Sequence, residues 1–181
     1  MRIRTFISIP IPDTTGLEGL VGDVRLTDGA KAAPLSQMHM TIRFIGDVDD
    51  RKVPRIERCV AEACAGMEPF GITIAGVGCF PNERRPNIIW AGAEPGDILT
   101  GLSERISENL VAANIQFDDK PFRSHVTVGR CRGPVDPTPI LGRYRDSVFC
   151  EFMCDHIDVM RSDLGPGGAK HSVLRRVDLG P

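Results

Sequence analysis

The sequence predicts an α+β fold in which two similar lobes of largely antiparallel sheet carry helices on the outside and face each other across a cleft. Strand patterns outnumber helix patterns along the 181 residues. Neighbouring strands are often joined by segments too short for a crossover helix, which favours antiparallel pairing. Each half of the chain also contains a helix pattern followed by a strand with the spelling His-x-Thr. We therefore expect residues 1–181 to form a single bilobal domain.

The first half alternates between strand and helix patterns. Apolar residues at every second position predict strands, and apolar residues spaced by three and four predict helices. The elements expected here are a strand at Arg2–Ile9, a helix capped by Asp13 or Thr14 and reaching Val24, a loop over Asp28–Pro34, a strand at Met38–Ile45 that ends near Gly46, and a helix from Asp49 or Asp50 to Ala63.

The second half contains more strands than the first. One helix pattern, at Leu99–Val111, is the last that the sequence predicts. The strands expected are Phe70–Gly78, Asn87–Ala91, a short one at Ile115–Phe117, Ser124–Arg130, Cys150–Arg161 and Ser172–Leu179. The last two are joined by Gly165-Pro166-Gly167-Gly168, which is typical of a hairpin turn.

Composition excludes several classes of protein. The chain has 41% hydrophobic and 25% charged residues, enough for an ordinary globular domain that buries roughly 70% of its unfolded surface. A formal net charge of −2 provides no overall positive field, so a protein that coats long nucleic acids is disfavoured.

The sequence indicates a cytoplasmic protein. The N-terminal segment is interrupted by Pro10 and Pro12 and lacks the apolar run of a secretory signal. No apolar stretch approaches the roughly 18 residues that a membrane span requires, so we expect no membrane partner. The six cysteines include no C-x-x-C pair, and we expect them to be reduced. Cys150, Cys154 and His156 would make a poor zinc site because no fourth ligand accompanies them.

The two His-x-Thr strands carry the chemical signal. Because strand side chains alternate between faces, His39 and Thr41 share one face, and His125 and Thr127 share one face of the second strand. The intervening apolar residues must then point into a core. If the strands meet across a cleft, two imidazoles and two hydroxyls converge on one small volume. This arrangement would provide an acid, a base and donors for an anion.

The motifs resemble those of the 2H phosphoesterase superfamily, and most closely its bacterial and archaeal RNA 2′,3′-cyclic phosphodiesterases, also called 2′-5′ RNA ligases. The resemblance rests on HMT, PFRSHVTVGR, CFPNERRPNIIWAG and the closing IDVMRSDL and HSVLRRVDL, and it covers nearly the whole chain. It implies a bilobal α+β fold, no metal or other cofactor, and hydrolysis of an RNA terminal 2′,3′-cyclic phosphate to a 2′-phosphomonoester. Reversal to ligation of RNA ends is also implied.

The resemblance assigns roles to particular residues. It implies that His39, Thr41, His125 and Thr127 are catalytic, with His39 as the acid on the 3′ oxygen and His125 as the base on water. Arg130 matches the basic residue that follows the second motif in the family. We expect substrate contacts from Arg130, Arg123 and Phe44. The chemistry is consistent with these residue types, because imidazole transfers protons near neutral pH and threonine hydroxyls donate to phosphate oxygens.

The sequence departs from the family pattern at two places, and strand alternation conflicts with the resemblance at two residues. The segment before the first motif, Thr27–Pro34, is small and polar where the family commonly has an aromatic loop, and Ser124 stands where proline is common. Strict alternation places Phe44 and Arg130 on the faces opposite their histidines. Either the strands end or bulge there, or those two residues lie outside the site.

The remaining polar candidates have a simpler structural interpretation. We expect His156 and His171 to be structural histidines, and Arg84 and Arg85 to lie in a solvated turn rather than on an RNA phosphate.

The sequence leaves alternatives open for the function itself. The protein could be a non-catalytic module that binds RNA ends, or a phosphodiesterase for 2′-5′ oligonucleotides or a small cyclic phosphate. The expected partners are RNA ends or nucleoside 2′,3′-cyclic phosphates, and we expect a monomer.

Overall fold

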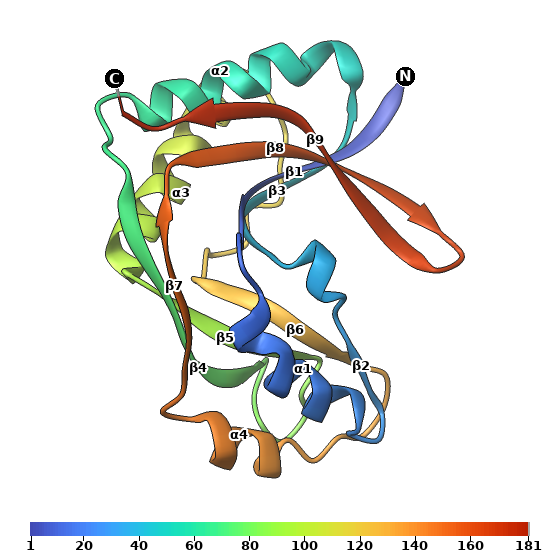
Figure 1. Ribbon diagram of the computed structural model, residues 1–181. Helices are drawn as coiled ribbons and strands as arrows, with labels where there is room; N and C mark the ends of the chain where they lie inside the picture. The colour runs from blue at the N-terminus through green and yellow to red at the C-terminus, as the bar shows by residue number, and fades with distance from the viewer. Residues whose placement is uncertain (181) are drawn as a thin grey trace.

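The computed structural model describes residues 1–180 and confirms the α+β class, with two antiparallel sheets and four α-helices in that part of the chain (Figure 1). The four-stranded sheet has the order β3-β1-β8-β9, and the five-stranded sheet has the order β2-β6-β5-β4-β7. The strands of the first sheet are β1 (Arg2–Pro10), β3 (His39–Asp49), β8 (His156–Gly165) and β9 (Gly168–Asp178). Those of the second are β2 (Ala30–Ala32), β4 (Phe70–Phe80), β5 (Ile88–Glu94), β6 (His125–Cys131) and β7 (Val148–Cys154).

The helices pack on the outside of the two sheets, as the sequence predicts. They are α1 (Glu18–Arg25), α2 (Val53–Cys64), α3 (Gly96–Ala112) and α4 (Thr138–Tyr144). Helices α2 and α3 contact each other and cover the four-stranded sheet, whereas α1 and α4 lie against the five-stranded one (Figure 1). In α2 the residues spaced by three and four, such as Val53, Ile56 and Val60, are buried and hold the helix on the core. No helix in residues 1–180 is both long and apolar enough to cross a lipid bilayer.

Both motif strands contain a β-bulge directly after the motif threonine. In β3, Thr41 pairs with Ser8 and Arg43 with Ile7, so Ile42 has no partner of its own on β1. In β6, Thr127 pairs with Trp90 and Gly129 with Ile89, so Val128 is the extra residue opposite β5. A bulge reverses the alternation of side chains beyond it. Residues beyond the bulge, including Phe44 and Arg130, therefore return to the face that carries the histidines.

Glycine at position 129 brings α1 close to the motif strand. A Cβ atom at this position would lie 2.5 Å from Cγ1 of Val24 on α1 and 3.3 Å from the carbonyl oxygen of Lys31 on β2. A side chain there would push the helix and the edge strand away from β6. The close packing of α1 against the second sheet thus depends on the absence of a side chain at Gly129.

Two segments of the first half differ from the expectation. Residues Ala30–Ala32, expected in a loop, form the short edge strand β2, because β6 supplies the pairing partner that the sequence pattern does not show. The first motif strand continues past Gly46 to Asp49, because this glycine adopts a φ of 95° and accommodates the irregular pairing with β1.

Three segments of the second half also differ. Ile115–Phe117 is not a strand. The neighbouring loop is held by the buried Arg43, whose guanidinium donates to the carbonyls of Asp118 and Lys120 at 3.3 and 2.7 Å. The segment Cys150–Arg161, expected to be one strand, belongs to two strands in different sheets. Strand β7 ends before Asp155 and strand β8 begins after it. Helix α4 was not expected, because it is short and buries only two residues.

Replacing Ile42 by alanine should lower the free energy of unfolding by about 2–5 kcal/mol, because this bulge residue is 2% exposed and its methyl groups fill the core. The matched control is Ile98→Ala, at a position that is 40% exposed, where a loss of about 1 kcal/mol or less is expected. Urea unfolding at constant m-value measures both. Equal losses for the two variants would contradict the core position of the bulge.

Candidate active site

The two motif strands face each other across a pocket with a volume of about 370 Å³. Strand β3 of the first sheet contributes His39 and Thr41, and strand β6 of the second contributes His125 and Thr127. All four residues line the pocket, so the structure brings together the two motifs that the sequence placed 86 positions apart. The β8–β9 hairpin, which projects beyond its sheet in Figure 1, lines the pocket with Gly167 and Gly168.

Each imidazole is held by a hydrogen bond of the same kind, from Nδ1 to a backbone carbonyl two residues earlier. Nδ1 of His39 lies 2.8 Å from the carbonyl oxygen of Gln37, and Nδ1 of His125 lies 2.6 Å from that of Arg123. A carbonyl oxygen only accepts, so Nδ1 carries the hydrogen in both rings. In the neutral imidazole, Nε2 is therefore the basic nitrogen. Each ring offers Nε2 as the atom that can accept or return a proton.

The hydroxyl of Thr41 is the nearest donor to the first imidazole. Its Oγ1 lies 3.1 Å from Nε2 of His39, at hydrogen-bond distance. Since Nε2 has no hydrogen in the neutral ring, the hydroxyl is the donor in this bond. Thr127 lines the opposite wall beside His125. Each motif strand thus lines the pocket with a hydroxyl as well as an imidazole.

A phenylalanine supports each imidazole from behind. Phe6 on β1 packs against His39 with ring centroids 5.0 Å apart, and Phe80 at the end of β4 packs edge-on against His125 at the same distance. These contacts restrict the rings and remove them from water. Each half of the site therefore has its own Nδ1–carbonyl hydrogen bond, threonine hydroxyl and phenylalanine ring.

Burial and nearby cations disfavour the charged form of both histidines. Burial lowers the pKa of His39 and of His125, and the guanidinium of Arg130 lowers both further, while the carbonyl bonds act in the opposite direction. Lys31, Arg130 and Arg132 line the pocket, and no carboxylate of residues 1–180 does so. An anionic ligand would offset this positive charge and favour the imidazolium forms.

The three predicted substrate contacts have different positions. Arg130 lines the pocket, because the bulge at Val128 returns it to the face of His125. Arg123 is exposed and its guanidinium lies over the ring of Phe80 at 5.7 Å, outside the pocket lining. Phe44 also returns to the face of its histidine, but it lies beyond the pocket, with the guanidinium of Arg4 over its ring at 4.8 Å.

The arginines of the turn after β4 also lie outside the pocket. The backbone N–H groups of Arg84 and Arg85 both donate to the side-chain oxygen of Asn82 at 3.0 Å, which closes a local turn, and both residues are exposed.

His171 is a residue of the pocket that the sequence pattern did not reveal. Its ring lies 5.0 Å from that of His39 and 4.9 Å from that of Phe6, so three rings form one cluster. Its backbone N–H donates to Oε1 of Gln37 at 3.0 Å, and burial lowers the pKa of its imidazole. No repeat marks this histidine in the sequence, and only the turn of the β8–β9 hairpin toward the cleft brings it to the site.

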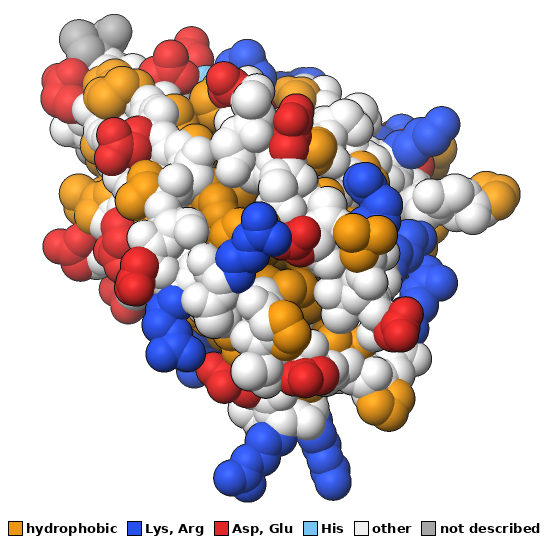
Figure 2. All heavy atoms as spheres, turned by 60° about the horizontal axis from the view of Figure 1, so that its bottom comes forward, with side chains coloured by type: hydrophobic (Ala, Val, Ile, Leu, Met, Phe, Trp, Pro, Cys, Tyr) orange, Lys and Arg blue, Asp and Glu red, His pale blue; other side chains and the backbone are white. Residues whose placement is uncertain are grey.

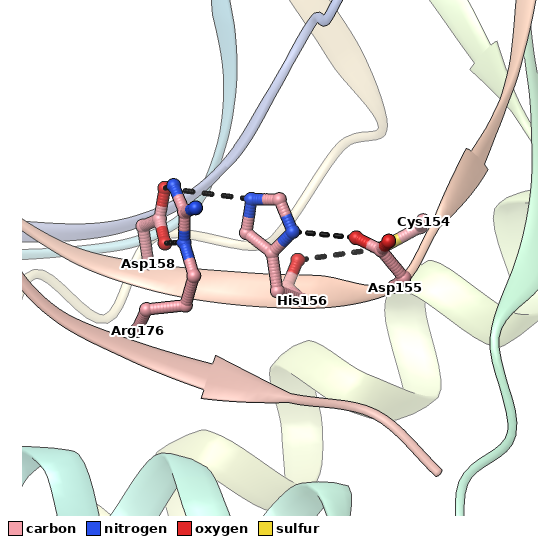
Figure 3. Close-up of polar contacts among 5 residues, drawn as sticks. All are labelled: Cys154, Asp155, His156, Asp158 and Arg176. Atoms are coloured by element: carbon pink, nitrogen blue, oxygen red, sulfur yellow. Dashed lines mark hydrogen bonds and ion pairs between the residues drawn. The ribbon is translucent and has the colours of Figure 1, made fainter.

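His156 lies in a separate polar cluster, at the start of β8 (Figure 3). Its Nδ1 is 2.5 Å from a carboxylate oxygen of Asp155, and its Nε2 is 3.8 Å from the buried carboxylate of Asp158. Arg176 on β9 donates to both oxygens of Asp158, at 2.9 and 3.2 Å. The Arg176–Asp158 pair ties β8 to β9, and His156 contacts the same carboxylate, which supports a structural role for His156.

The sulfur of Cys154 is also engaged within this cluster. It contacts the carbonyl oxygen of His156 at 3.6 Å rather than the imidazole. Within residues 1–180, no three His, Cys, Asp or Glu side chains are grouped as a metal site would require.

Two antiparallel sheets whose facing His-x-Thr strands enclose a basic pocket have the architecture of the two-histidine phosphoesterases that the motifs resemble. Residues 12–166 match the model of the 2′-5′ RNA ligase superfamily. The chain belongs to this superfamily, which confirms the resemblance seen in the sequence.

Similar proteins support this assignment over nearly the whole chain. The chain is 29% identical to an RNA 2′,3′-cyclic phosphodiesterase of Methanothermobacter thermautotrophicus, covering 93% of this chain and 94% of that protein. It is 30% identical to an RNA 2′,3′-cyclic phosphodiesterase of Archaeoglobus fulgidus, covering 96% of this chain and 98% of that protein. A crystal structure of a Thermus thermophilus protein matches with a TM-score of 0.82 and 27% identity over 98% of both chains. Escherichia coli LigT complexed with 3′-AMP shares the fold at a TM-score of 0.78 and 16% identity, covering 100% of both chains.

Titration of the imidazoles tests the electrostatics of the site. We expect His39 and His125 to titrate below the ordinary histidine pKa of 6.5, and Arg130→Gln to raise both values, because a guanidinium disfavours the imidazolium. Two-dimensional NMR of the four histidines measures this directly. Arg84→Gln, an exposed arginine outside the pocket, is the control and should move neither titration. Unchanged values in the Arg130 variant would contradict the placement of this side chain.

Proposed function

We propose that the protein hydrolyses RNA terminal 2′,3′-cyclic phosphates to 2′-phosphomonoesters by general acid–base catalysis with His39 and His125. The observation that carries the proposal is the pair of imidazoles that line one cationic pocket, each with its Nδ1 atom hydrogen-bonded to a backbone carbonyl, which leaves Nε2 as the basic nitrogen. The names of the relatives, which are RNA 2′,3′-cyclic phosphodiesterases, support the same substrate and reaction.

The reaction needs proton transfer on both sides of phosphorus. His125 takes a proton from water through Nε2, and the resulting hydroxide attacks phosphorus as the bond to the 3′ oxygen breaks. The imidazolium of His39 donates its Nε2 proton to that oxygen, leaving a free 3′ hydroxyl and a 2′-phosphate. Each such transfer contributes about 10²–10⁴ in rate. We assign the acid and the base in this order from the family resemblance.

The hydroxyls and the arginine stabilise the charge that develops on the phosphate. Thr41 and Thr127 lie on opposite strands, so each can donate to a different non-bridging oxygen. Arg130 adds a planar pair of donors suited to two phosphate oxygens. The substrate phosphate also opposes the lowering of the His39 pKa by burial, because an anion beside this ring favours the imidazolium that must act as the acid.

The same geometry bears on the alternative functions. A pure RNA-end binder would need donors for the phosphate but no pair of basic Nε2 atoms, so the paired tautomers favour an enzyme over a binding module. The pocket accommodates a terminal cyclic phosphate whether the chain beyond it is RNA, a 2′-5′ oligonucleotide or absent. Ligation would be the reverse of the same steps, and the excess of water favours hydrolysis. All of the proposed catalytic residues belong to one chain, so a monomer would suffice.

Turnover of adenosine 2′,3′-cyclic phosphate is the direct test of this proposal. The expected product is the 2′-phosphate, identified by its chromatographic mobility against authentic 2′- and 3′-AMP. Binding without turnover would support the RNA-end module instead, and formation of the 3′-phosphate would reverse the assigned direction of ring opening.

Substituting the histidines tests whether they act as a pair. His39→Ala and His125→Ala should each lower kcat by about 10²-fold or more, and the double variant should lose little beyond either single one, because acid and base act in the same step. Thr41→Ala and Thr127→Ala should cost less, because proton transfer remains.

His156→Gln is the matched control, since this histidine lies outside the pocket and should leave turnover near the parental rate. Unfolding midpoints show whether each variant is folded. Losses that multiply in the double variant would indicate independent roles for the two histidines.

Turnover should also persist in EDTA, because the two imidazoles supply the transfers that a metal-bound water would otherwise provide. The measurement compares dialysed protein with and without chelator. Loss of activity that zinc or manganese restores would refute this expectation.

A further inference from the structure

Two cations lie directly opposite each other at the edge of the five-stranded sheet. Lys31 on β2 pairs with Arg130 on β6 in antiparallel register. Side chains paired in this way share a face of the sheet, with Cβ atoms about 4.5–5.5 Å apart, and like charges in such pairs are destabilising. Neither side chain forms an ion pair with a carboxylate of residues 1–180. The fold therefore concentrates positive charge here without balancing it.

A second hollow of about 440 Å³ adjoins the catalytic pocket on this side. Lys31, Ala32 and Arg132 line both spaces and form the boundary between them. Arg25, in the last turn of α1, lines the second hollow but not the catalytic pocket. Figure 2, in which the bottom of Figure 1 comes forward, shows several Lys and Arg side chains along its right-hand edge, the side on which Figure 1 places β2, and others at its centre, left and lower edge.

The covalent structure of the substrate determines which anion can reach this hollow. In a terminal 2′,3′-cyclic phosphate the 2′ and 3′ oxygens of the ribose both belong to the cyclic phosphate. The rest of the RNA is therefore attached only through the 5′ oxygen. With the cyclic phosphate between the two histidines, the nearest other phosphate is the one on that 5′ oxygen. The next phosphate lies one nucleotide further along the chain.

We propose that Lys31 and Arg132 bind the phosphate on the 5′ oxygen of the terminal nucleotide and that Arg25 binds the next phosphate, so that the protein prefers oligonucleotide ends to mononucleotides. This proposal rests on the proposed function and assigns its substrate class. The unbalanced cations and the adjoining hollow carry it, because charge-assisted contacts to phosphate are among the strongest hydrogen bonds a surface can offer.

A substrate series tests the proposal. The kcat/KM for ApA 2′,3′-cyclic phosphate should exceed that for adenosine 2′,3′-cyclic phosphate by on the order of tenfold. Adenosine 2′,3′-cyclic phosphate with an added 5′-phosphate should gain a similar factor, because the phosphate is the group that binds. Each phosphate contact should also make the slope of log kcat/KM against log salt more negative by about 0.7.

Variants locate the two contacts. Lys31→Gln and Arg132→Gln should each reduce the ratio of dinucleotide to mononucleotide kcat/KM by about threefold or more. Arg25→Gln should reduce the ratio of the kcat/KM for the trinucleotide to that for the dinucleotide. Arg84→Gln, exposed and outside both hollows, is the control and should change neither ratio.

The outcomes separate this proposal from the function on which it rests. Equal kcat/KM for all the substrates, with hydrolysis intact, would overturn the phosphate subsite and leave the proposed function standing. A gain for the dinucleotide but none for the 5′-phosphorylated mononucleotide would overturn it in favour of contacts to the second nucleoside. If no cyclic phosphate is hydrolysed, the proposed function fails and the subsite with it.

Discussion

The site depends on one hydrogen bond that the chain forms twice, from each imidazole Nδ1 to the carbonyl two residues earlier. His39 and His125 are the first residues of β3 and β6, so the carbonyls of Gln37 and Arg123 precede the paired strands. These oxygens are available to an imidazole because they lie before the sheet ladder begins. The position of the histidine at the start of its strand thus determines which nitrogen is basic. The facing sheets, the bulges and the aromatic supports all serve to place that nitrogen in the pocket.

The sequence was sufficient for the parts of the site that local pattern encodes. Repetition singled out His39 and His125 from the four histidines, and alternation placed Thr41 and Thr127 beside them. Alternation alone put Arg130 on the wrong face, because a bulge depends on how β6 pairs with β5. Gly129 is the one local hint, since glycine inside a strand often marks a bulge or a close approach.

Other features depend on contacts between distant segments and could not be predicted in this way. His171 reaches the pocket only because the β8–β9 hairpin turns toward the cleft. The strand at Ala30–Ala32 exists because β6 pairs with it, although its sequence, Ala-Lys-Ala, shows no strand pattern. The break at Asp155 separates two strands that look continuous in sequence, because only the assembled sheets show where the chain leaves one for the other.

Gln37 connects two walls of the pocket through different atoms. Its backbone carbonyl accepts the hydrogen bond from His39, and its side-chain oxygen accepts one from the backbone of His171 on the hairpin. The orientation of one imidazole and the position of the hairpin are thus mechanically coupled through a single residue. Because both bonds end on Gln37, any shift of the hairpin at His171 would act on the same residue that aligns the His39 ring.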